Sequence, residues 1–175
     1  MNPLRLPSRQ LFTLAALACA ALLGYGFFLQ YAKGLEPCPL CLVQRGFFFA
    51  AMLVLLAGAL HGPRATGTKV YAGLAFLFAA GGAAVATRQV WLQHLPADKV
   101  PQCGPDLYFM LENFPLAQTL KKLITGTGEC AAVDWTFLGL SIAEWSLAWF
   151  VGLALYAAWL ALRRDARAAS TAAAA

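Results

Sequence analysis

Two cysteines separated by a proline and a leucine stand directly before a long apolar run. The motif is Cys38-Pro-Leu-Cys41, and the run that follows covers residues 42–60. Two thiols at this spacing can close and reopen a disulfide by exchange, which moves two electrons. Because the run after the motif is long enough to cross a bilayer, the pattern predicts a redox-active pair at a membrane surface.

Arg45 stands four residues after Cys41, so a helix that begins at the motif places both residues on one face. A nearby cation and the positive end of a helix both favour a thiolate. We therefore expect the Arg45 guanidinium to lie near the Cys41 sulfur. Pro39 suits the first turn of such a helix, where its missing N–H is not needed. The alternative for Arg45 is a side chain that extends to lipid head groups.

Two further cysteines, Cys103 and Cys130, lie in a long hydrophilic segment. With the first pair they allow three disulfide pairings, and the sequence does not choose among them. A two-residue spacing closes too small a loop to stabilise a fold much, which argues against purely structural bridges. Cys103 and Cys130 are too far apart to form a second zinc knuckle, so we predict no metal site. Cys19 lies inside an apolar run and is predicted to be a buried filler.

Composition identifies the elements that must carry these cysteines. The chain has 175 residues, of which 61% are hydrophobic and 12% charged, a balance typical of integral membrane proteins. Apolar runs cover residues 11–29, 42–60, 70–90 and 142–162. We predict an all-α membrane protein, a single domain in which four transmembrane helices form a bundle.

Two of the runs need comment. The first run continues past the small residues around Ala18, which favours a spanning helix over a cleaved signal peptide. The third run contains Gly81 and Gly82, and small residues of this kind let membrane helices approach closely. Both features favour packed membrane helices.

Charge bias predicts the orientation in the membrane. Segments 1–10, 61–69 and 163–175 carry most of the basic residues, whereas the short segment 30–41 has only Lys33. By the positive-inside rule both termini are cytoplasmic, and segments 30–41 and 91–141 lie outside the cytoplasm, in the periplasm or a similar space. The same side follows from the cysteines, because disulfides persist in oxidising compartments. The net charge of +5 comes with no phosphate loop and no basic patch with interleaved aromatics, so we predict no nucleic-acid partner.

The long periplasmic segment has two parts. Prolines at 96, 101 and 105 predict an extended chain around Cys103. Further on, apolar residues recur at helical spacing and polar residues occupy the other face, which predicts a short amphipathic helix that lies on membrane lipid or packs on the protein itself. The apolar residues are Leu116, Leu120, Leu123 and Ile124, and the polar ones are Gln118, Lys121 and Lys122.

These motifs together resemble the disulfide bond formation protein B (DsbB) family of membrane thiol:quinone oxidoreductases. The resemblance covers essentially the whole chain and rests on the four runs, the Cys38–Cys41 motif, Arg45, the Cys103 and Cys130 pair, and Trp135-Thr-Phe-Leu-Gly-Leu140 before the last run. It implies a partner, the periplasmic thioredoxin-fold oxidase DsbA, and a quinone cofactor, ubiquinone or menaquinone. The DsbA–DsbB–quinone system is known to keep the bacterial periplasm oxidising.

The resemblance also implies roles for individual residues. Cys103 would form the mixed disulfide with the partner, and Cys130 would exchange with Cys38. Cys41 would then be the thiolate that meets the quinone ring, while Arg45 would bind a quinone oxygen. Gln30 and Trp135 are further quinone-site candidates.

The chain departs from its relatives at two positions. Gln89 stands where some members have a histidine, and Gln44 where some have an acidic residue, so proton handling at these positions is not carried over. His94 lies nearby at a membrane edge, and we assign it no role. The alternatives are a DsbB paralogue with a dedicated partner and a vitamin K epoxide reductase-like protein, although the latter family places its dicysteine on a late helix.

Overall fold

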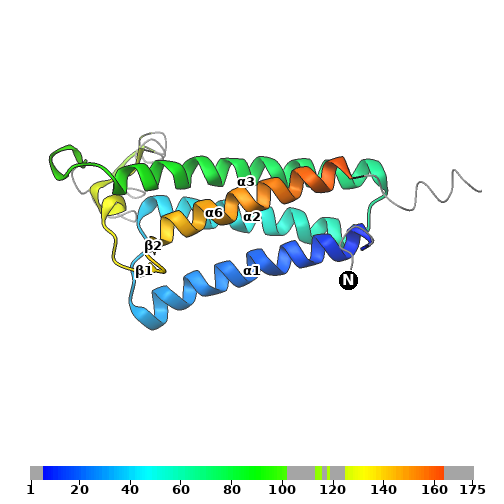
Figure 1. The fold of residues 1–175 in the computed structure, drawn as a ribbon, viewed down its shortest axis with the longest axis horizontal. Coiled ribbons are helices and arrows are strands. Elements are labelled where there is room, and N and C mark those ends of the chain that lie inside the picture. The colour runs from blue at the N-terminus through cyan, green and yellow to red at the C-terminus, as the bar shows by residue number, and fades with distance from the viewer. Residues whose placement is uncertain (1–5, 102–112, 116–117, 119–124, 164–175) are drawn as a thin grey trace, which may run out of the picture.

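Four long helices account for most of the structure, a computed structural model that describes residues 6–101, 113–115, 118 and 125–163. Each described helix of this kind is long and apolar enough to cross a membrane, and each contains one predicted run. The predicted four-helix transmembrane architecture is confirmed (Figure 1). The helices are α1 (Ser8–Lys33), α2 (Pro39–His61), α3 (Ala65–Gln93) and α6 (Ile142–Leu162).

Local sequence signals explain where the helices begin and end. Gly34 follows α1 and Gly62 follows α2, each with a positive φ (66° and 57°) that a residue without Cβ adopts without strain. Ahead of α6, the Ser141 hydroxyl accepts from the Glu144 backbone N–H while the Glu144 carboxylate accepts from the Ser141 N–H, a complete capping box. Because of Gly34 and Gly62, α1 and α2 each end soon after their apolar runs.

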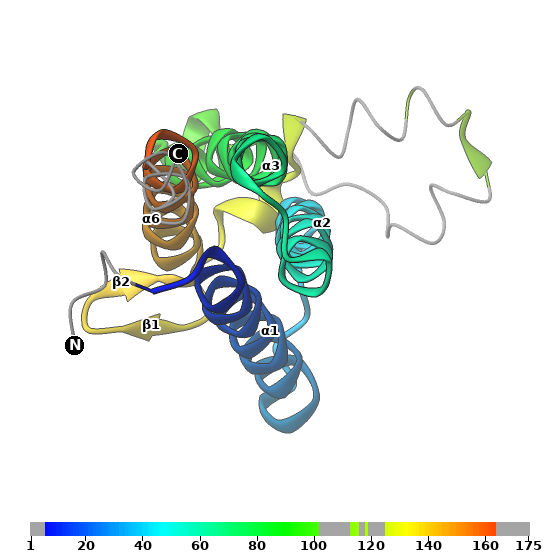
Figure 2. The same cartoon turned by 90° about the vertical axis from the view of Figure 1, so that its right-hand side faces the viewer.

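The helices pack in a fixed order around the bundle. α3 lies between α2 and α6, and α1 packs on α2 (Figure 2). A Cβ on Gly82 would clash with the ring of Phe150, and one on Gly81 would come within 2.6 Å of Phe47. Phe150 in turn stacks on Phe48 with ring centroids 3.8 Å apart. The prediction that these glycines permit close helix packing is therefore correct.

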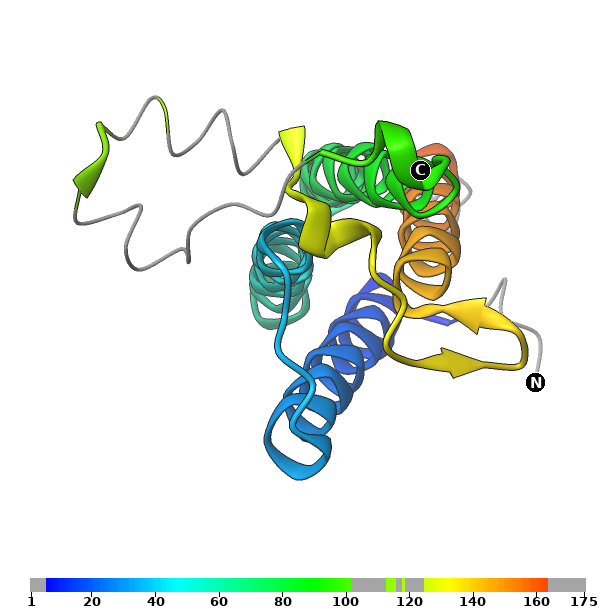
Figure 3. The same ribbon diagram turned by 90° about the vertical axis from the view of Figure 1, so that its left-hand side faces the viewer.

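Short elements gather at the end of the bundle where α1 stops and α2 starts (Figure 3). They are the 3₁₀ turns η2 (Ala97–Lys99) and η3 (Gly128–Ala131) and the strands β1 (Thr136–Phe137) and β2 (Leu140–Ser141). The two strands form an antiparallel hairpin in which Phe137 pairs with Leu140. Ser141 ties this hairpin to α3, because its hydroxyl donates to Gln93 Oε1 at 2.8 Å.

Some predictions fall on other parts of the chain. Cys103 and the amphipathic segment around Leu116–Ile124 lie outside the described residues. Cys19, by contrast, is described, and it is buried inside α1 as predicted.

Candidate active site

Cys38 and Cys41 occupy the first turn of α2. Cys38 is the N-cap, and its sulfur accepts from the Cys41 backbone N–H at 3.4 Å. Pro39 is the first helical residue, as predicted, and it loses no hydrogen bond there. Both thiols are free, and Cys38 Sγ donates to Cys41 Sγ across 2.9 Å. The helix start thus holds the two sulfurs side by side.

Cys130 reaches the same place from the far end of the sequence. It is buried in η3, in a small cluster with Leu40, Leu92 and the partly buried Cys38. The approach needs a glycine at 126, where φ is 78° and a Cβ would come within 2.6 Å of Leu92. A hydrogen bond links the Cys130 and Cys38 thiols. The Cys38 sulfur therefore lies between two other sulfurs.

These contacts set the order in which Cys130 and Cys38 lose their protons. The hydrogen bond from Cys38 lowers the pKa of Cys130 to about 6, against the opposing effect of burial, with help from backbone hydrogen bonds to Leu40 and Thr127. The same hydrogen bond to Cys130 is the largest cause of a raised pKa at Cys38, followed by the one to Cys41. These hydrogen bonds favour the thiolate form of Cys130 and the protonated form of Cys38.

Two glutamines complete the surroundings of the sulfurs. Gln89 on α3 and Gln44 on α2 are each only 3% exposed. Gln44 Nε2 donates to Gln89 Oε1 at 2.6 Å, which directs Gln89 Nε2 toward Cys38 Sγ (3.3 Å) and Cys41 Sγ (3.2 Å). The pair presents a neutral donor to both sulfurs.

Arg45 takes a different position from the one expected. Its guanidinium turns toward α1, where Nη1 donates to Gln30 Oε1 at 2.5 Å and Nη2 to the Gly26 carbonyl at 3.0 Å. It also lies 5.1 Å from the centroid of the Phe27 ring. Among the described residues the side chain that contacts the Cys41 sulfur besides Cys38 is Gln89. Arg45 and Cys41 both belong to α2 and both line the same cavity, but the hydrogen bonds of the guanidinium go to α1.

A cavity of about 1050 Å³ brings these residues together. Cys38, Cys41 and Arg45 form part of its wall, and Gln30 and Trp135 also line it. Most of the lining is apolar and comes from α1, α2, α6 and the segment before the hairpin. All the described candidate residues except Cys130 therefore face one space. Among the described residues there is no cluster of three or more acidic, histidine or cysteine side chains that could hold a metal.

Sequence reasoning set Gln44 and Gln89 aside, although Gln89 donates to both sulfurs and Gln44 orients it. A signal was present, since an uncharged polar residue inside an apolar run is expensive to bury without a partner. The signal did not identify the partner of either glutamine, because Gln44 and Gln89 are far apart in sequence and come together only when α2 packs on α3. His94 is exposed, with Nδ1 2.9 Å from the Val90 carbonyl, and does not line the cavity.

A membrane bundle that holds paired thiols at the start of a spanning helix is the class of protein that this fold and site define. The family model described as disulfide bond formation protein DsbB matches residues 8–160, and the chain belongs to that family. It is 56% identical to disulfide bond formation protein B of Hahella chejuensis, over 93% of this chain and 98% of that protein. The corresponding protein of Methylococcus capsulatus is 52% identical, over 86% and 93%. The chain is thus a disulfide bond formation protein, with the role of a disulfide oxidoreductase.

Proposed function

We propose that the chain passes electrons from a periplasmic thioredoxin-fold dithiol oxidase, DsbA or a paralogue of it, to a membrane quinone. The observation that carries the proposal is the position of Cys38, whose sulfur contacts both Cys41 and Cys130. A sulfur between two others can exchange with either one. It is also the link between the buried Cys130 and the cavity lined by Cys41.

The relay begins with a disulfide between Cys103 and Cys130. A thiolate of the partner attacks Cys103, which forms a mixed disulfide and releases the Cys130 thiolate. That thiolate attacks Cys38 in the Cys38–Cys41 disulfide, and Cys41 leaves as a thiolate. The partner's second thiolate then closes the partner's own disulfide and frees Cys103. Cys103 finally attacks Cys130, restores the Cys103–Cys130 disulfide and releases Cys38. Cys38 and Cys41 are then both reduced and carry the two electrons.

The geometry supports the middle step. Cys130 lies beside Cys38, whose sulfur it attacks, and backbone hydrogen bonds to Leu40 and Thr127, which do not depend on a Cys38 thiol, lower the pKa of Cys130 and favour its thiolate. The Gln89 amide donates to Cys41 Sγ and thereby stabilises the negative charge on the leaving sulfur. Gln44 holds that amide in place.

The cavity fits a quinone. It is large and mainly apolar, and it offers fixed donors from Arg45 close to the wall formed by Cys41. When bound, the quinone accepts two electrons and two protons. Arg45 would bind a ring oxygen and stabilise charge there, Gln30 would orient the guanidinium, and Trp135 would enclose the ring. All four spanning helices contribute to the lining, so the cavity belongs to the part of the chain that contacts the bilayer in which a quinone dissolves.

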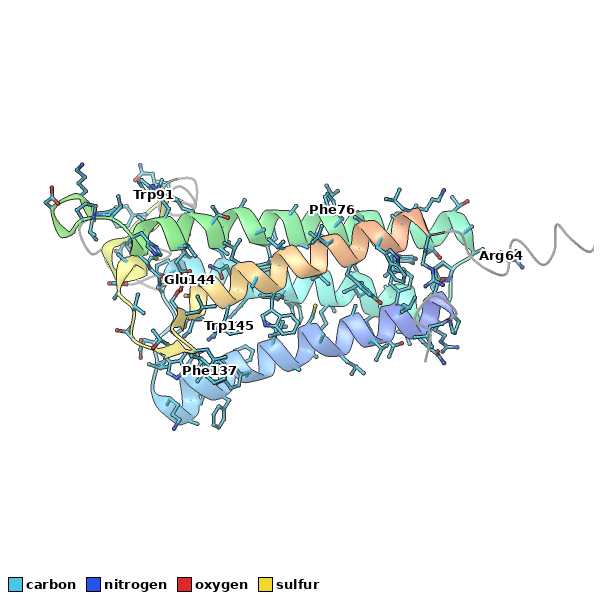
Figure 4. The ribbon with its side chains drawn as sticks, viewed as in Figure 1. Arg64, Phe76, Trp91, Phe137, Glu144 and Trp145 are labelled. Atoms are coloured by element: carbon cyan, nitrogen blue, oxygen red, sulfur yellow. The ribbon has the colours of Figure 1, made fainter. Side chains whose placement is uncertain are left out.

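The orientation stays with the charge bias. Arg64 lies at the end of the bundle away from Glu144 and Trp145 (Figure 4), and Arg9 and Arg163 belong to the same end as Arg64. We place that end on the cytoplasmic side of a bacterial inner membrane and the cysteines on the periplasmic side.

Turnover of a soluble quinone tests the function. Full-length protein in lipid nanodiscs is mixed with reduced DsbA, and the loss of quinone absorbance is followed. We expect turnover with the native chain and none with Cys38→Ser or Cys41→Ser, because either change cuts the route to the acceptor. Cys19→Ala is the matched control, since Cys19 is buried in α1 away from the cavity lining. Turnover near the native rate in Cys41→Ser would contradict the proposal.

A further inference from the structure

The hairpin of β1 and β2 leaves the bundle sideways and exposes apolar side chains (Figures 2 and 3). No residue from 135 to 143 is charged. Leu138 is 79% exposed and Phe137 52%, and Leu140 is exposed as well. Such a continuous apolar surface on a protruding loop is not suited to water.

The residues in the turn of the hairpin are also poorly suited to contact with water. Leu138 and Gly139 are its two central residues, with φ values of 54° and 80°. Two-residue hairpins favour this conformation, and asparagine, aspartate or glycine usually occupy the first position because they tolerate a positive φ. The chain has a leucine there, in a backbone conformation that strains it. A polar residue would serve a turn in water better on both counts.

Aromatic contacts fix the level of the hairpin along the bundle. The Trp135 ring packs edge-on against Tyr25 of α1, with centroids 6.3 Å apart. Tyr25 lies four residues inside the apolar run 11–29, roughly 6 Å from its end along the helix axis. On the other side, Trp145 in the first turn of α6 donates its indole N–H to the Phe137 carbonyl at 3.0 Å (Figure 4). The hairpin is therefore level with the ends of two spanning helices.

The same contacts connect the hairpin to the exposed surface of α1. Phe28 is 53% exposed on that helix and stacks with Tyr25, which contacts Trp135. Trp135 stacks in turn on Phe137. An unbroken aromatic path thus runs from a spanning helix to the hairpin, so whatever covers the helix at that level also covers the hairpin.

We propose that the hairpin is seated in the bilayer, in the boundary between head groups and acyl chains, with lipid as its partner. Leu138 and Phe137 extend into the upper acyl region, and Trp135 and Trp145 lie where aromatic belts form. The boundary suits a two-stranded element, because paired strands satisfy part of the backbone and hydrated head groups satisfy the outer edges. A leucine in the turn then gains an apolar environment, which offsets its strained backbone.

Photo-crosslinking tests this placement. A benzophenone amino acid replaces Leu138 in the full-length chain, which is placed in nanodiscs of phosphatidylethanolamine and phosphatidylglycerol and irradiated. Intact-mass and peptide analysis then measures the adducts. We expect a phospholipid adduct at position 138. The matched control carries the same group at Asp98, an exposed residue of η2 beyond the end of α3, where we expect no phospholipid adduct above the unirradiated sample.

Other outcomes would overturn the proposal. Adducts to a second copy of the chain would make the hairpin a protein interface, and adducts to added DsbA would make it a partner-docking surface. Equal yields of phospholipid adduct at positions 138 and 98 would show that the hairpin has no specific contact with lipid. Because the turn is strained, a second probe replaces Leu140, an exposed residue of β2 outside the cavity lining, and the same lipid adduct is expected there.

Discussion

The side-chain amide of Gln89 lies 3.2 Å from Cys41 Sγ and 3.3 Å from Cys38 Sγ and donates toward both sulfurs. Its orientation depends on Gln44, which donates to the Gln89 oxygen at 2.6 Å. A neutral amide therefore provides the hydrogen-bond donor to both sulfurs. Charge on a sulfur is stabilised there without a side chain that titrates near neutral pH.

Gln89→Leu should slow reduction of the acceptor by roughly tenfold, because a hydrogen bond to a charged group contributes about 1.5 kcal/mol or more. Gln44→Glu should slow it too, since a carboxylate cannot donate to Gln89 Oε1 and the amide would turn its oxygen toward the sulfurs. Single-turnover quinone absorbance measures both effects. Thr87→Val is a control from the same helix, at an exposed residue outside the cavity lining. Native rates in both variants would exclude this role.

Arg45→Leu should raise the quinone KM and lower the rate, at a cost of about 3 kcal/mol in transition-state stabilisation. Arg45→Lys should restore only part of it, because a point charge cannot donate at once to Gln30 and the Gly26 carbonyl. Steady-state kinetics with varied quinone, at saturating DsbA, measures the change. If the quinone dependence of Arg45→Leu is native, the arginine serves the packing of α1 on α2 instead.

The difference between expectation and structure at Arg45 has a physical cause. Spacing along a helix fixes the face on which a side chain starts, so the sequence placed Arg45 beside Cys41 correctly. An arginine side chain is long, however, and its end is determined by acceptors on another helix, here Gln30 and Gly26 of α1. Gln44 and Gln89 are 45 residues apart in sequence, and only the packing of α2 on α3 brings them together.

Other features could be predicted because they depend on short stretches. Runs of apolar residues predicted the four helices, and Pro39 after Cys38 predicted the start of α2. The approach of Cys130 to Cys38 was implied by family resemblance alone. It depends on the left-handed Gly126 and on burial between Leu40 and Leu92, which no periodicity reports.

The reactivity of Cys130 should depend on pH with a midpoint near 6. The hydrogen bond with Cys38 lowers the pKa of Cys130 to about 6, so the thiolate should prevail above pH 6 and be lost as the pH falls below it. Burial slows a reagent at every pH and does not move the midpoint. The rate of modification by a small uncharged thiosulfonate, followed by peptide mass in the reduced protein, measures this dependence. A midpoint near 9 would contradict the hydrogen bond with Cys38.

Gly82→Ala should destabilise the bundle by about 1–3 kcal/mol, because the new Cβ would overlap the ring of Phe150. Gly152→Ala is the matched control within α6, with no atom within 4 Å of the new Cβ, and should be stabilising by about 0.5–1 kcal/mol. Thermal unfolding in the same detergent compares the two variants. Equal stabilities would show that α3 and α6 are not in close contact at this level.

The relay depends most directly on the claim that Cys38 exchanges with Cys130 as well as with Cys41. In the double variant Cys41→Ser, Cys103→Ser, Cys38 has lost its partner within the motif, and no Cys103 thiol remains to take Cys130 away from it. Mild oxidation followed by peptide mass mapping should reveal a Cys38–Cys130 disulfide. Cys38 and Cys130 that both stay reduced, under conditions in which the native chain forms its disulfides, would contradict the account.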